Sequence, residues 1–330
     1  MPEAKQRKGL YAVLAAVTVL GGWYMLHAFR ASAADALPGL LLLAPKESSF
    51  IGYADLETLR ESPLAQQLTA MAPPATVDPD YADFVNGTGF DYQRDLDHVL
   101  VAAGEAPGQT LMFAEGRFNR EKIEQYVLRS GKFAEENGHP VYVVPSATPG
   151  KNIQFAFLAA DRIAFANGGD LSAVLSASAA AELDPAMRER ISRVAGAPLF
   201  AAIKGSALNG SLGMAGAGGA GLSALFAPVR WVSLAARPDG ETVLLSAEGE
   251  CDRAEEAQKV ASALDLLRNI FRGAMADPKA RGQMPAESAA ATSKLLEGMK
   301  ITTESTRVRL LVSLTPDMLR LPAAPPAAGQ

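Results

Sequence analysis

Apolar and polar residues alternate along much of the chain after residue 45, and this pattern predicts a series of β-strands. Short turns join most of the neighbouring strands, so antiparallel pairing is expected. The pattern therefore favours an α+β fold of mostly antiparallel sheets with packed helices. The expected strands lie at 50–55, 98–103, 109–118, 140–145, 152–160, 161–168, within 197–208, in a hairpin at 229–250, and at 299–305 and 307–315.

Apolar positions at helical spacing predict several helices between these strands. Asn119 is the expected N-cap of a helix at 119–131, and Pro185 occupies the first turn of a helix at 184–195. Asp252 and Glu255 have capping-box spacing at the start of a longer helix. We expect that helix to pack on the sheet through one apolar stripe, made of Ala257, Val260, Ala261, Leu264, Leu267 and Phe271.

The order of expected elements repeats loosely along the chain. The stretch SSFIGYADLETL near residue 50 is similar in pattern to APLFAAIKGSAL near residue 200, and each precedes a strand pair, a helix and a further strand. This predicts two loosely repeated α+β halves, residues 30–195 and 196–321. The Pro- and Ala-rich tail, residues 322–330, is expected to be disordered.

The strongest signal is a basic segment followed by an uncharged apolar run at the amino terminus. Residues 1–8 include Lys5, Arg7 and Lys8, and residues 9–29 contain no Lys, Arg, Asp or Glu. A helix over that run would be about 32 Å long, which matches a hydrocarbon core of about 30 Å. Residues 9–29 thus predict one membrane anchor, with the amino terminus in the cytoplasm and the body on the periplasmic side of the inner membrane.

A cleaved signal peptide is the alternative interpretation of the same segment. Ala31, Ser32 and Ala33 form an A-x-A site. The apolar run is longer than the h-region of such peptides, and Arg30 stands before the site. Cleavage would leave a soluble periplasmic or secreted protein, so both interpretations predict an exported body.

Composition excludes some classes of partner and chemistry. The chain has 330 residues, 48% of them hydrophobic, and a formal net charge of −5, which argues against nucleic acid as a partner. The single cysteine, Cys251, cannot form an internal disulfide. It is interpreted as a small buried hydrophobe rather than a nucleophile. No Cys or His cluster has zinc-ligand spacing, so neither a metal nor a cofactor is predicted.

The stretch GFDYQRDLDHVLVAAG, residues 89–104, is the densest group of candidate ligands. Counting a calcium loop from Asp91 puts Leu96 at position 6 and Ala102 at position 12, where glycine and glutamate are needed. Asp97 and His98 are neighbours in an expected strand, so their side chains leave on opposite faces. We therefore interpret Asp91 as the cap of a short turn, with Asp95 and Asp97 leading into the strand.

The glycine-rich stretch contains Gly216, Gly218 and Gly221 at G-x-G-x-x-G spacing, but no strand directly precedes it and Pro228 follows closely. Ser211 lacks the G-x-S-x-G frame of a hydrolase. The histidines His27, His98 and His139 have no spacing that brings two together. The sequence accordingly predicts no catalytic, cofactor-binding or metal-binding residue.

Residues 205–229 carry no charge, which is unusual for an exposed loop. One interpretation is a flexible loop that packs partly on the core. The other is a segment that contacts the membrane or an envelope protein or lipid partner.

The stretches SSFIGYADLETLRESP and FVNGTGFDYQRDLDHVLVAAG through LMFAEGRFNREKIEQYVLRSG resemble a group of bacterial envelope proteins of unknown function. The similarity covers residues 45–145 and, more loosely, Ala235 to Arg272. It implies one amino-terminal hydrophobic segment and an exported α+β body, and it supplies no catalytic residues.

Two functions remain open from the sequence. The first is an anchored, non-enzymatic interaction or envelope-assembly protein. The alternative is an exported hydrolase with an unrecognised carboxylate or serine site, which predicts a pocket with strongly perturbed titratable groups.

Overall fold

The computed structural model describes residues 38–63, 79–105, 110–129, 131–145, 152–167, 170–176, 183–211, 226–278 and 286–319. The predicted basic segment 1–8, the anchor 9–29 and the tail 322–330 lie outside these ranges. Among the helices within them, none combines the length and the apolar character needed to cross a bilayer.

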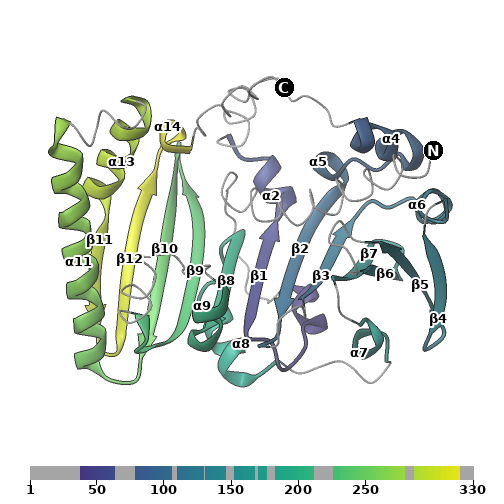
Figure 1. The fold of residues 1–330 in the computed structure, drawn as a ribbon, viewed down its shortest axis with the longest axis horizontal. Coiled ribbons are helices and arrows are strands. Elements are labelled where there is room, and N and C mark those ends of the chain that lie inside the picture. Colours follow the sequence, from purple (N-terminus) through teal and green to yellow (C-terminus); the bar gives the residue numbers. More distant parts are fainter. Residues whose placement is uncertain are drawn as a thin grey trace.

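The strands form one antiparallel sheet of 12 strands in the order β11-β12-β10-β9-β8-β1-β2-β3-β7-β6-β5-β4 (Figure 1). The α+β class and the antiparallel pairing are as predicted, although one continuous sheet replaces the several sheets expected. The strands are β1 (Phe50–Asp55), β2 (Leu96–Ala103), β3 (Thr110–Gly116), β4 (Lys132–Glu136), β5 (His139–Pro145), β6 (Asn152–Ala159), β7 (Arg162–Asn167), β8 (Leu199–Lys204), β9 (Val229–Asp239), β10 (Thr242–Cys251), β11 (Lys300–Glu304) and β12 (Arg307–Leu314).

The helices are mostly short and connect or cover the strands. They are the 3₁₀ helix η1 (Gly39–Leu43) and the α-helices α2 (Leu56–Arg60), α4 (Pro79–Thr88), α5 (Tyr92–Asp95), α6 (Arg120–Val127), α7 (Ser172–Leu175), α8 (Pro185–Ser192), α9 (Gly205–Ser211), α11 (Ala254–Ala276), α13 (Ala286–Gly298) and α14 (Pro316–Leu319).

One face of the sheet carries a large core beneath η1, α7 and α8. Alternate residues of a strand point to the same face, so Leu100 and Ala102 of β2 join this core together with Ile51 of β1. Met187 and Ile191 of α8 close it from outside and are 1% and 0% exposed.

The opposite face is covered in two places. Helices α4 and α6 pack over β2, β3 and β5–β7 through an aromatic-rich cluster that includes Phe84, Tyr126 and Phe155. Helix α11 packs over the other half of the sheet, where Ala257 and Val260 meet strands β10 and β12. Figure 1 shows α11 and α13 beside β11 and β12, far from α4 and α6.

Several local predictions are confirmed because a side chain satisfies the backbone where expected. Asn119 accepts a hydrogen bond from the Lys122 N–H at the start of α6, and Asp184 caps α8 with Pro185 in the first turn. The β9–β10 hairpin turns at Gly240, whose φ of 62° lies in the left-handed region.

The structure differs from the sequence-based expectations in three places. The hairpin β4–β5 was not predicted, although Asn137 and Gly138 at its turn have φ values of 52° and 77°. Arg253, not Asp252, is the N-cap residue of α11, and the Asp252 carboxylate pairs with Arg230.

Phe271 is the third difference, because it is 54% exposed rather than part of the core stripe. Helix α11 has 23 residues and the adjacent β11 has five. A helix of that length spans about 35 Å and such a strand about 17 Å. The carboxyl-terminal part of α11 therefore extends beyond the edge strand.

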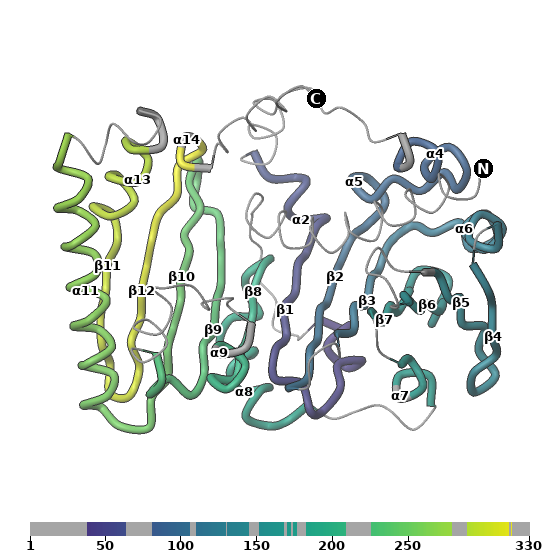
Figure 2. Tube along the Cα trace, in the orientation of Figure 1, coloured from purple at the N-terminus to yellow at the C-terminus, as the bar shows by residue number. Residues whose placement is uncertain are grey.

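Two ends of the sheet matter for the site. At the η1 end, β1 begins at Phe50, β8 ends at Lys204, β9 begins at Val229 and β10 ends at Cys251. At the α2 end, β1 leads into α2 and the β9–β10 hairpin turns. Figure 2 shows the same strands as a tube, with the η1 end at the lower edge of the view.

Gly116 lies so close to the backbone of a neighbouring strand that a side chain at this position should destabilise the fold. A Cβ at this position would lie 2.2 Å from the Asp95 carbonyl oxygen and 3.1 Å from the Leu96 Cα, and backbone atoms yield little. We expect Gly116→Ala to lower the free energy of unfolding by about 1–3 kcal/mol, measured by urea denaturation.

Gly273 is the matched control, because nothing lies within 4 Å of its Cβ position in α11. Gly273→Ala should raise the free energy of unfolding by about 0.5–1 kcal/mol through helix propensity. Equal effects of the two substitutions would contradict the close approach at Gly116.

Candidate functional site

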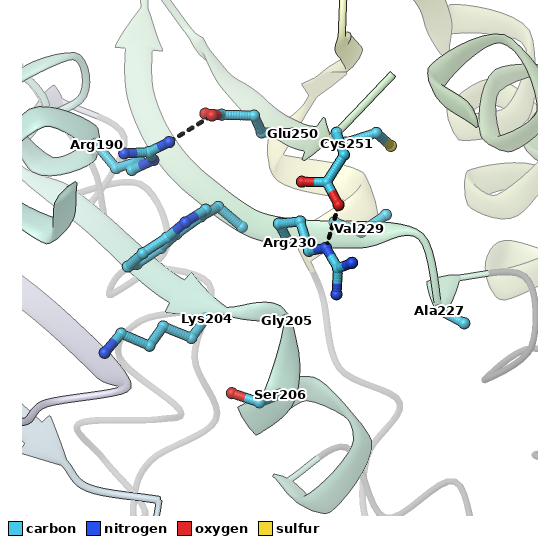
Figure 3. A pocket seen from close by; sticks show the side chains of 11 residues that line it. Arg190, Lys204, Gly205, Ser206, Ala227, Val229, Arg230, Glu250 and Cys251 are labelled. Carbon is cyan, nitrogen blue, oxygen red and sulfur yellow. Dashed lines mark hydrogen bonds and ion pairs between the residues drawn. The ribbon is translucent and has the colours of Figure 1, made fainter. Parts of the chain in front are cut away.

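A pocket of about 480 Å³ lies at the η1 end of the sheet, where β8 and β10 end and β9 begins. Figure 3 shows Arg190 and Glu250 on one side of it, joined by a dashed line, and Lys204 and Ser206 on the other. The lining residues are Arg190, Lys204, Gly205, Ser206, Ala227, Val229, Arg230, Trp231, Glu250, Cys251 and Asp252.

The strand register builds the floor of this pocket. Lys204 of β8 and Glu250 of β10 both lie opposite Trp231 of β9, so the three side chains form one row on one face of the sheet. Gly205 lets β8 turn into α9, because a Cβ there would lie 2.0 Å from the Val229 carbonyl oxygen. The chain therefore needs glycine at the point where the pocket begins.

Two cations lie over the Trp231 ring, Arg190 from α8 and Lys204 from β8. The Arg190 guanidinium lies 4.8 Å from the centre of the Trp231 ring, and the Lys204 ammonium lies 5.8 Å from it. Arg190 also pairs with Glu250, and Lys204 approaches the Asp184 carboxylate at 3.5 Å. Each cation over the indole ring thus has a carboxylate partner.

The charges continue as a network across β10 and β12. Arg193, the C-cap residue of α8, donates to the second Glu250 oxygen at 3.0 Å. Glu248, two residues earlier in β10 and on the same face, accepts from Arg309 at 2.8 Å and lies 3.9 Å from Arg307. Two carboxylates of one strand therefore join α8 to β12.

The pKa directions in the pocket follow from these contacts. Burial raises the pKa of Glu250, but hydrogen bonds from Arg193 and Arg190 outweigh burial, so the pKa of that carboxyl is lowered below its usual value. Burial, and then the charges of Glu256, Asp252 and Glu250, raise the pKa of the Cys251 thiol. The carboxyl is therefore a weakened base and the thiol stays protonated.

The rim of the pocket is more exposed and also paired. Arg230 and Asp252 interact at 2.7 Å with side chains 62% and 57% exposed, where solvent screens such pairs. The Ser206 hydroxyl donates to the Glu105 carboxylate at 3.1 Å, so this polar group is also paired.

A second polar cluster lies at the α2 end, on the same face of the sheet. Asp55, His98, Glu115 and Arg162 occupy successive register positions on β1, β2, β3 and β7. The His98 Nε2 lies 3.8 Å from Asp55, and its Nδ1 lies 3.3 Å from Glu115, which accepts from Arg162. Burial, together with these two carboxylates, raises the pKa of Tyr53, whose ring stacks on His98.

The aspartates of the stretch 89–104 serve local structure and ion pairs. Asp91 caps α5 by accepting from the Gln93 N–H, as predicted. Asp95 pairs with Arg94 and Arg117, and Asp97 pairs with Arg60 and Arg117. Because Asp97 contacts α2 and His98 contacts Asp55 and Glu115, the two neighbours have separate partners. In the described part of the chain, no three His, Cys, Asp or Glu residues are grouped to hold a metal ion.

The other residues considered in the sequence do not come together. Cys251 is buried at the end of β10, His139 begins β5 and Ser211 is the last residue of α9. His27 and the three glycines Gly216, Gly218 and Gly221 lie outside the described residues.

The Trp231 pocket was not predicted from the sequence. One signal for it was present, because Glu248 and Glu250 alternate with small residues in a strand and must share a face. Two carboxylates on one strand face imply cations above them, but pattern alone does not identify Arg190 and Arg193 as those cations.

Comparisons with known proteins give a resemblance of fold only. No protein-family model matches the chain, and no curated protein matches it. Among solved structures, crystal form III of TP0453 has a TM-score of 0.49 at 13% identity, covering 87% of this chain and 97% of that chain. Crystal form IV has a TM-score of 0.47 at 12% identity, covering 91% and 97%. At these scores the resemblance carries no argument about function.

Proposed function

We propose that this chain is a membrane-anchored, exported protein whose body acts as a non-enzymatic interaction or envelope-assembly protein. Its amino terminus lies in the cytoplasm, residues 9–29 cross the inner membrane once, and the body lies on the periplasmic side. The uncharged run of 21 residues behind Lys5, Arg7 and Lys8 carries the assignment of location. If the segment is cleaved after Ala33, the body is soluble in the periplasm or secreted.

The paired charges of the Trp231 pocket carry the non-enzymatic part of the proposal. A catalytic base needs a pKa near the working pH, and a catalytic thiol needs a lowered pKa. Glu250 and Cys251 shift in the opposite directions. The pocket therefore supports a structural role, in which Arg190 and Arg193 fasten α8 to the sheet.

Exposed apolar side chains support interaction with a partner. Leu266 and Ile270 are neighbours one turn apart on α11 and are 61% and 56% exposed, and Phe271 is 54% exposed. A soluble body that had no partner would gain from polar residues at these positions. The uncharged residues 205–229 supply a second candidate contact, toward an envelope protein or a lipid.

We also infer that the halves 30–195 and 196–321 are two copies of one α+β unit. In each half a single strand, β1 or β8, precedes a hairpin, β2–β3 or β9–β10. Helix α6 follows in the first half and α11 in the second. The last hairpin of each half, β6–β7 or β11–β12, then pairs with the first hairpin of that half in the sheet. The same order on both sides of the β1–β8 pair supports this inference.

The location is tested by a reporter fused after Gln330. A reporter enzyme that is active only after export should be active, and one that is active only in the cytosol should be inactive. Carbonate extraction of the full chain should leave it in the membrane pellet. Activity of the cytosolic reporter alone would refute the proposed orientation.

The structural role of the pocket is tested with Glu250→Gln. Arg190 and Arg193, whose side chains are 11% and 24% exposed, would each lose one of their charged partners. We expect the free energy of unfolding to fall by about 1–3 kcal/mol at about pH 7. A lowered pKa stabilises the fold above the unfolded value of 4.5, and this contribution is lost as pH falls through the folded pKa. The difference between wild type and variant should therefore shrink as the pH falls below 4.5.

Glu189→Gln is the matched control for Glu250→Gln. Glu189 also pairs with Arg190, at 3.1 Å, but its side chain is 60% exposed. Its loss should change the free energy of unfolding by less than about 0.5 kcal/mol. Urea denaturation across the pH range measures both variants, and a difference that grows as pH falls would contradict the assignment of Glu250.

The contact through the uncharged segment is tested by deleting residues 211–221. Crosslinking in native membranes, followed by mass spectrometry, should recover fewer partner or lipid adducts than with the full chain. Removing residues 320–330, a tail segment of equal length, is the control and should change nothing. Unchanged adducts and membrane association after the first deletion would rule the segment out as a contact.

A further inference from the structure

The described body begins at the η1 end of the sheet, and its first residues are firmly packed. Leu40 and Leu41 of η1 are each 1% exposed and belong to the core on the α8 face. Ser49 then donates to the Ala103 carbonyl oxygen as β1 begins. The chain that comes from residues 9–29 is therefore fixed to the body at this end.

The length of the connection limits where the η1 end can lie, and this step rests on the proposed anchor. Eight residues, 30–37, separate Phe29 from Pro38. Fully extended, they reach about 30 Å. A body of this size is about 50 Å across, from the scaling of the radius of gyration with chain length. The connection is therefore shorter than the body, and η1 stays near the bilayer.

Leu42 is the apolar residue that this end presents to its surroundings. It lies in the run Leu40–Leu43, follows the two buried leucines and is 64% exposed. Moving a leucine side chain from water into an apolar medium lowers the free energy in proportion to the apolar area that leaves the water. A leucine left this exposed beside the membrane connection would gain that energy from the lipid interface.

The two described ends of an uncharged stretch lie at the same end of the sheet. Helix α9 follows Lys204 directly, and residues 226–229 lead into β9, so both described ends of the uncharged stretch 205–229 lie here. The cations nearby have acidic neighbours, because Lys204 lies near Asp184, Arg230 pairs with Asp252, and the exposed Lys46 after η1 is followed by Glu47. Balanced charge removes the need for anionic lipid and suits a zwitterionic surface.

We propose that the η1 end of the sheet lies against the periplasmic surface of the bilayer, with Leu42 inserted among zwitterionic phospholipids. Figure 1 shows this end at the lower edge of the sheet, opposite α2 and the β9–β10 turn. The lipid surface is the partner of the η1 end, and the α2 end faces away from the membrane.

Lipid-quenching of two probes tests this orientation. The full chain carries Cys251→Ala, together with Leu42→Cys or Asp239→Cys, and each new thiol bears an environment-sensitive fluorophore. Asp239 is exposed at the α2 end and is the matched control. In vesicles of phosphatidylethanolamine and phosphatidylcholine that contain spin-labelled lipid, we expect the probe at 42 to be quenched at least about twofold more than the probe at 239.

Flotation of the same vesicles separates the inference from the anchor on which it rests. A chain that fails to float with the vesicles overturns the anchor and the orientation together. A chain that floats, with equal or no quenching at 42 and 239, overturns the orientation and leaves the anchor intact. Protection of the probe at 42 by a second copy or another protein, without quenching by lipid, also overturns it.

Discussion

The pairing of β1 with β8 is the contact on which the rest of the sheet depends. These strands are distant in sequence, and their antiparallel register joins the strands of both halves into one sheet. Tyr53 and Phe200 lie opposite each other and stack with ring centres 5.0 Å apart. Without this pair, each half would expose a long apolar strand edge, which in a soluble protein invites aggregation. Residues of β1 and β8 contribute to the cores on both faces of the sheet.

Much of the fold was predictable where the signal is local. The Asp239–Gly240 turn, the Asn119 cap and Pro185 were recognised because a side chain or a backbone restriction acts within a few residues. The β4–β5 hairpin has an equally strong local signal in Asn137–Gly138. It was missed because β4 is five residues long and three of them are charged, so the alternation of apolar and polar residues is weak. At this hairpin, the residue types at the turn indicate the structure better than the pattern of apolar residues in the strands does.

The candidate site could not be predicted for a different reason. Arg190 and Glu250 are separated by 60 positions and belong to different elements, so their pairing depends on where α8 lands on the sheet. The same long-range choice explains the failure at Asp252. Its spacing to Glu255 fits a capping box, but β9 brings Arg230 within 2.7 Å of it. A contact between residues 22 positions apart cannot be recognised from a local spacing pattern.

Charged side chains at both ends of the sheet are paired within the body. At the α2 end, Asp55, His98 and Glu115 are tied in a row across neighbouring strands, and at the η1 end Glu250 holds α8. Since these charges find partners within the body, the fold needs no soluble ligand to neutralise them. The described body also exposes apolar side chains, as at Leu42. Apolar surface is removed from water by contact with another surface, such as a bilayer or a protein, and this is the physical basis of the interaction role proposed above.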